Sequence, residues 1–137
     1  MTTEIIANKV ASYLTGLSAT SEIPTALGTR LVASINLFVG FEVDTDVDSI
    51  TLIPYPGSPP NRDGYRQESS VQIRLKTSST EKALKVGQAC VNYLHMKQVS
   101  GVARIQALNS GPLILGRIEG EEWCISTVNF SIKHIKV

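Results

Sequence analysis

The sequence has few charged residues and almost no net charge. Of its 137 residues, 18% are charged, and 13 Lys and Arg stand against 12 Asp and Glu, which leaves a formal net charge of +1. Proteins that coat nucleic acids need a surface rich in Lys and Arg, because their affinity comes largely from neutralising phosphates. A neutral balance also protects poorly against self-association. The composition therefore argues against a nucleic-acid coat and favours an assembly protein.

The sequence also lacks any apolar run near the ~20 residues that cross a bilayer. Residues 1–4 carry no basic region ahead of an apolar stretch, so we expect no secretory signal and a soluble protein made in the cytosol. Only two cysteines are present, Cys90 and Cys124, with no second Cys or His at ligand spacing. We expect both to be reduced and buried, and the chain to form a single domain over residues 1–137 without metal or disulfide.

Hydrophobic periodicity in the first half predicts one helix and two strands. Apolar residues at steps of three and four predict an amphipathic helix over residues 3–15. Residues 18–29 are rich in Ser, Thr and Gly, which predicts an irregular connection with room for a short helical turn. Alternation predicts strands over residues 35–43, with one buried face, and 50–55. Because Asp44 to Asp46 mark a turn between them, we expect these strands to form a hairpin.

A strand followed directly by a helix comes next. In residues 70–76 apolar and polar side chains alternate, so one face should meet a core and the other water or a partner. Ser78 and Glu81 have the spacing of a capping box, which predicts a helix through Leu94. Gly87 costs about 1 kcal/mol inside a helix, and its simplest use is close approach to a sheet. The expected apolar helix face is Ala83, Leu84, Gly87, Cys90, Val91 and Leu94.

Alternation in the remaining chain predicts three strands, over residues 102–108, 113–118 and 123–135. The turn residues 119–121 predict a tight hairpin between the last two. In the last strand the apolar residues change parity, which a bulge near Ser126 would reconcile. The elements together predict an α+β fold, a mostly antiparallel β-sheet with two main α-helices packed on one face.

The residues that could carry chemistry do not form a recognisable motif. His95 and His134 lie on different elements, with no nucleophile elbow and no second His at zinc spacing, although a triad assembles in space rather than in sequence. Cys90 lies on the apolar helix face, where desolvation raises a thiol pKa. We expect no catalytic residue and no cofactor.

Three alternating aspartates, Asp44, Asp46 and Asp48, resemble the start of a calcium loop. Such a loop also needs Gly at position six and Glu at position twelve, and those places hold Ser49 and Tyr55. A solvated turn explains the aspartates better than a metal site does.

The long proline-rich loop over residues 54–66 is the clearest candidate for function, because long exposed loops are usually functional or disordered. Basic residues follow it, but acidic residues such as Asp63 and Glu68 dilute them, which favours a protein interface or a solvated face over nucleic acid. Open sheet edges are further sites for strand addition or ring contacts. The candidate interface residues are Tyr55, Arg62, Tyr65, Arg66, Arg74 and Lys76.

The order of elements resembles a known family. An N-terminal amphipathic helix is followed by a hairpin ending in LIPYPGSPP (52–60), the strand VQIRLK (71–76), the helix EKALKVGQACVNYL (81–94) and antiparallel strands to the end. This pattern is similar to the tail terminator, or minor capsid, proteins of long-tailed bacteriophages. The likeness covers residues 3–135 as an order of elements and 50–95 in residue pattern, while residues 18–34 have no counterpart.

The resemblance implies a structural protein of the virion with no catalytic residues. Family members form a ring, usually of six subunits, which caps the tail tube, stops its growth and joins the tail to the head connector. The implied partners are copies of the chain itself, the tail tube protein and the head-tail connector protein, with DNA passing through the ring and no membrane. Two alternatives stay open: a non-enzymatic adaptor within a larger complex, and a small-molecule-binding α+β domain with a pocket between helix and sheet.

Overall fold

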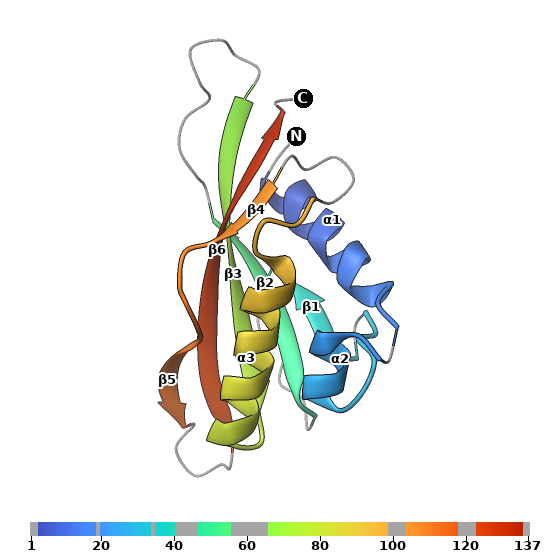
Figure 1. Cartoon of the computed structure of the whole chain (residues 1–137), viewed down its shortest axis with the longest axis vertical. Helices are drawn as coiled ribbons and strands as arrows, with labels where there is room; N and C mark the ends of the chain where they lie inside the picture. The colour runs from blue at the N-terminus through green and yellow to red at the C-terminus, as the bar shows by residue number, and fades with distance from the viewer. Residues whose placement is uncertain are drawn as a thin grey trace.

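The computed structural model of the chain describes residues 3–18, 20–33, 35–40, 47–55, 66–98, 104–117 and 123–135, excluding the side chains of residues 3–6, 55, 66–68, 117 and 134–135. Within these residues two helices come first, followed by strands, a further helix and more strands (Figure 1). Their order is α1 (Thr3–Thr15), α2 (Glu22–Leu27), β1 (Leu37–Val39), β2 (Ser49–Tyr55), β3 (Arg66–Thr77), α3 (Thr80–Leu94), β4 (Arg104–Ala107), β5 (Leu113–Arg117) and β6 (Cys124–Ile135).

The described strands form one sheet in the order β1-β2-β3-β6-β4, and β5 also pairs with β6. β3 and β6 are the two long central strands, paired along twelve residues each. β4 and β5 share the far edge of β6: β4 pairs with residues 130–133 and β5 with residues 124–127. All pairings are antiparallel except that of β1 with β2. The helices lie on the same face of the sheet (Figure 1), which confirms the expected α+β class.

The core lies between this sheet face and the helices. Alternation along the central strands turns one set of apolar side chains toward the helices, as the period of a strand requires. These strand residues are Ile50, Leu52, Val71, Ile73, Leu75, Val128, Phe130 and Ile132. The opposing helix residues include Val10 and Leu14 of α1 and Val86, Cys90 and Leu94 of α3. None of the helices in the described part of the chain is long and apolar enough to span a membrane.

The prediction that the first two strands form a hairpin is wrong, because β1 runs parallel to β2, with Leu37 opposite Ile50. Alternation reports which face of a strand is buried, and it is the same for both strand directions. Within the described residues β1 is also shorter than expected, since it covers Leu37–Val39; residues 41–43 of the expected strand lie outside them. Asn36 holds a turn before β1 by accepting from Val32 N–H and donating to Arg30 O, and Gly40, at φ 99°, follows its end. The expected turn at residues 44–46 lies outside the described residues.

Helix α1 has its predicted bounds, and the expected helical turn in the connection is α2. The start of α3 differs from the expected capping box. Ser79, not Ser78, is the N-cap, and its hydroxyl accepts from Lys82 N–H at 3.1 Å. The backbone N–H of Ser78 donates instead to Asp48 Oδ1 at 2.7 Å. The apolar face of α3 also differs, because Leu84 is half-exposed whereas Val86 and Ala89 are buried.

The expected bulge in the last strand is also misplaced. β6 pairs with β3 without a register shift from Cys124 to Ile135. The irregularity lies in β5, where Ile114 pairs with Ser126 and Gly116 with Ile125, so that Leu115 is the extra residue. The change of parity has a simpler cause. Ile125 pairs with Lys76 and so lies on the sheet face away from the helices, and the Trp123 ring contacts the Lys76 ammonium on that face.

Candidate interaction surfaces

The described residues contain no group of three or more His, Cys, Asp and Glu side chains that could hold a metal ion. Both cysteines are free and buried, as expected. Burial raises the pKa of the Cys90 thiol to about 12, so its reactive thiolate is scarce at neutral pH. Cys90 therefore belongs to the core.

The histidine and aspartate singled out in the sequence hold elements together. His95 is the C-cap that follows α3, and its Nδ1 accepts the backbone N–H of Ala107 at 3.0 Å, which ties the helix to β4. Asp48 forms an ion pair with Lys82, which joins the start of β2 to the first turn of α3. The side chain of His134 lies outside the description, as do Asp44 and Asp46.

Two tyrosines join α1 to α3. The hydroxyl of Tyr13 donates to that of Tyr93 at 3.2 Å, with the rings stacked at a centroid distance of 6.2 Å, and the Lys97 ammonium lies 4.5 Å from the centroid of the Tyr93 ring. Burial, together with Tyr93, raises the pKa of Tyr13 to about 12. These groups stabilise the helix layer.

Most of the candidate interface residues lie in or next to the proline-rich loop. Arg62 and Tyr65 lie outside the described residues. Tyr55 ends β2 and Arg66 begins β3, but their side chains are not described. Their role at an interface stays a prediction.

Arg74 and Lys76 lie on the sheet face away from the helices, as the alternation predicts. Arg74 is half-buried, and Lys76 is only 4% exposed. The Lys76 ammonium lies 5.0 Å from the centroid of the Trp123 ring, a cation–π contact within the chain. In the isolated chain, therefore, Lys76 does not present its charge to a partner, and a role at an interface stays a prediction.

The structure instead exposes aliphatic side chains at both edges of the sheet, which the sequence did not single out. We define the β5 patch as Leu108, Leu113 and Leu115, which are 56%, 58% and 52% exposed. Leu108 N–H donates to Asn129 O at 2.9 Å, and Leu113 pairs with Thr127, so both follow the same edge of β6. Alternation predicts that such leucines lie in strands, but the bulge and the free edge decide their exposure.

We define the β1 patch as Val32, Ile35 and Val47, which are 44%, 60% and 45% exposed. Ile35 N–H donates to Val32 O at 3.1 Å in the turn before β1. Val47 comes two residues before β2, and Ile35 two residues before β1. Because β1 and β2 are parallel and in register, their N-terminal ends are neighbours in the sheet, and the three residues belong to the segments that lead into those ends.

Helix α3 holds the segment between β4 and β5 in place. A Cβ at Gly87 would overlap the ring carbons of Pro112, and one at Gly111 would lie 3.0 Å from Gln88 Oε1. Gly87 therefore allows the close approach that its position predicts, although to this segment rather than to a strand of the sheet. The segment that leads into β5 is therefore closely packed against α3.

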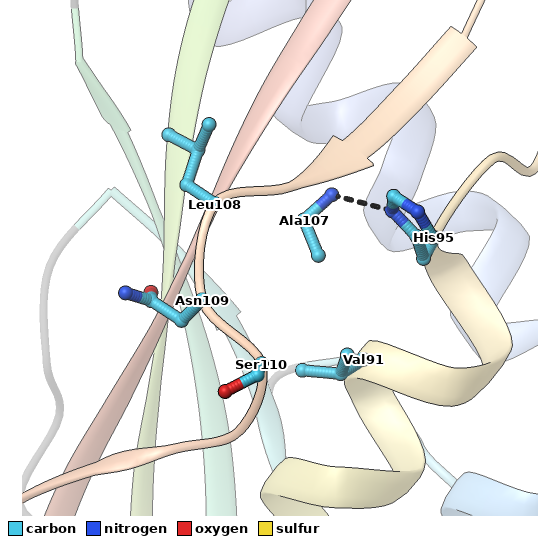
Figure 2. Close-up of a pocket in the computed structure, with 6 residues that line it drawn as sticks. All are labelled: Val91, His95, Ala107, Leu108, Asn109 and Ser110. Carbon is cyan, nitrogen blue, oxygen red and sulfur yellow. Dashed lines mark hydrogen bonds between the residues drawn. The ribbon is translucent and has the colours of Figure 1, made fainter.

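An open depression of about 330 Å³ lies between the same segment and the C-terminal half of α3 (Figure 2). Its lining residues are Val91, His95, Ala107, Leu108, Asn109 and Ser110. Two polar groups are already used inside the chain: His95 accepts from Ala107, and Asn109 Oδ1 accepts from Asn129 N–H at 2.9 Å. The depression is therefore a shallow feature beside the β5 patch, rather than a pocket with polar groups directed at a ligand.

A family model described as bacteriophage tail terminator protein matches residues 6–133, which is nearly the whole chain. No curated protein matches the chain.

Proposed function

Because the chain belongs to the bacteriophage tail terminator family, a structural family of the virion tail, we propose that it forms a ring that ends the tail tube. The ring has six subunits, caps the last ring of tube protein and stops its polymerisation. It sits at the head-proximal end of the tail, where it joins the head connector, and DNA passes through its opening. The chain acts by contact and not by catalysis.

The family match over residues 6–133 carries this proposal, because it spans both helix layer and sheet. The exposed aliphatic side chains at the two sheet edges support it, since apolar side chains left in water are available for contact with a neighbouring subunit. A ring-forming subunit also needs two different contact surfaces, one for each neighbour.

The test is the polymerisation of tail tube protein in the presence of increasing amounts of this chain. We expect tubes to stop growing, with a ring density at one end in negative-stain images. Native mass spectrometry should show an assembly of six chains of 14.8 kDa, about 89 kDa, either free or on tube ends.

A variant that breaks the core serves as the control. Phe130 is 1% exposed, so Phe130→Asp should not fold and should leave tube length unchanged. If the wild-type chain stays monomeric both alone and with tubes, and tube length does not respond to it, the proposal is wrong.

A further inference from the structure

We infer that the β5 patch of one subunit packs against the β1 patch of the next, so that neighbouring copies associate head to tail through opposite edges of their sheets. The inference rests on the proposed ring, and it assigns the surfaces that close it. The occupant of each patch is a second copy of this chain.

The positions of the patches support this pairing. β5 and β1 lie at opposite edges of the described sheet (Figure 1). The β5 patch follows the half of β6 that begins at Cys124, and the β1 patch lies at the start of β2, where Ser49 pairs with Lys76. Lys76 in turn pairs with Ile125, so both patches lie at the same end of the long strands. If two copies are related by rotation about an axis parallel to the long strands, the β5 patch of one copy can therefore meet the β1 patch of the other.

Strand directions are compatible with this contact. β5 is antiparallel to β6, β6 to β3, and β3 to β2, whereas β1 is parallel to β2. β5 and β1 therefore run in opposite directions across the sheet. When two copies meet edge to edge with their helices on the same side, β5 of one copy faces β1 of the next in antiparallel sense, the commoner arrangement of neighbouring strands.

The exposed area favours a ring over a two-fold dimer. Three half-exposed aliphatic side chains offer on the order of 200–300 Å² per patch, well below the ~800 Å² per partner of a stable interface. A dimer made through one patch would be weak and would leave the other patch in water. A closed head-to-tail ring covers both patches on every subunit, and each subunit is held by two contacts.

A mixing experiment tests the assignment. Leu113→Asp with Leu115→Asp disables the β5 patch, and Val32→Asp with Ile35→Asp disables the β1 patch; all four side chains are well exposed, so both variants should fold. We expect each variant alone to lose ring formation. Mixed together they should form only a weak one-to-one dimer of about 30 kDa, detected by chemical cross-linking at high protein concentration, because each still has the single patch that the other needs. Leu84→Asp, an equally exposed position on α3, is the matched control and should form rings like the wild type.

Cross-linking covers the case in which rings form only on tube ends. A chain with Ile35→Cys and Leu115→Cys, treated with a short bismaleimide on capped tubes, should give a ladder of covalent oligomers up to the full ring. Each single variant should give none, and the native Cys90 and Cys124 contribute little because both are buried.

The outcomes separate this inference from the proposed function. If the wild type caps tubes and both patch variants still do so, the assignment is overturned and the ring proposal stands. If Leu115→Cys alone cross-links to itself, the contact is two-fold and the head-to-tail assignment is overturned. If the wild type neither assembles nor caps tubes, the proposed function fails first.

Discussion

Lys76 shows how a single residue can lie on the predicted face and still be buried. It stands opposite Ile125 of β6, two residues after Trp123, so the indole ring and the lysine share the outer sheet face. The ring covers the ammonium, which is attracted to the negative face of the aromatic system. Lysine also buries its aliphatic stem readily along apolar neighbours. The ammonium therefore has a favourable contact within the chain.

Gly87 is the residue at which packing most clearly overrides helix propensity. Alanine would favour the helix by about 1 kcal/mol, but its Cβ would overlap the ring of Pro112. We expect Gly87→Ala to lower the free energy of unfolding by about 1 to 2 kcal/mol, measured by urea denaturation. Gln88→Ala, at an exposed neighbour, should change it by less than about 0.5 kcal/mol. A Gly87→Ala protein as stable as the wild type would show that Pro112 moves freely.

At the scale of elements, α3 packs against several other elements of the described fold. It contacts β3, β4, β6 and α2, and Asp48 and His95 tie its two ends to β2 and β4. The N-cap of its first turn is Ser79, whose hydroxyl accepts from Lys82 N–H. Because the backbone N–H of Ser78 donates to Asp48, the helix begins one residue later than the capping-box spacing predicts. A tertiary contact thus selects which serine caps the helix.

This assignment makes a paired prediction. Ser79→Ala should lower the free energy of unfolding by about 1 kcal/mol, because Lys82 N–H loses its acceptor. Ser78→Ala should change it by less than about 0.5 kcal/mol, because only the backbone of Ser78 is bonded to Asp48. Thermal and urea unfolding of both variants provide the measurement. Equal losses at the two serines would argue for a shared cap.

On the scale of the whole molecule, the two edges of the sheet differ from its centre in the side chains that they expose. The central strands carry the core, whereas the edges carry half-exposed valine, isoleucine and leucine. Short strands and a bulge blunt these edges, as proteins commonly do to avoid uncontrolled pairing. Apolar side chains on a blunted edge suit a contact that closes with a defined neighbour.

The proline-rich loop offers an independent prediction at this scale. Charge reversal at Arg62, Arg66 and Arg74 should raise at least tenfold the concentration needed to cap tubes, if these residues contact a neighbouring subunit or the tube. Because Arg74 is half-buried, Arg62→Glu with Arg66→Glu is also tested without it. Lys85→Glu, an exposed charge on α3, is the control. Unchanged capping by a folded variant would remove the loop from the interface.

What the sequence by itself determined was mainly local: the bounds of α1, the α+β class, the presence of β2, the buried face of β3, and the burial of both cysteines. Each of these depends on periodicity or composition, which neighbouring residues set. Strand direction in β1, the cap of α3, the bulge in β5 and the exposure of the edge leucines were decided only by tertiary structure. They depend on partners distant in sequence: β2 for β1, Asp48 for Ser78, β6 for Leu115 and Trp123 for Lys76. Alternation indicates that a face is apolar, but only the assembled sheet determines whether anything covers it.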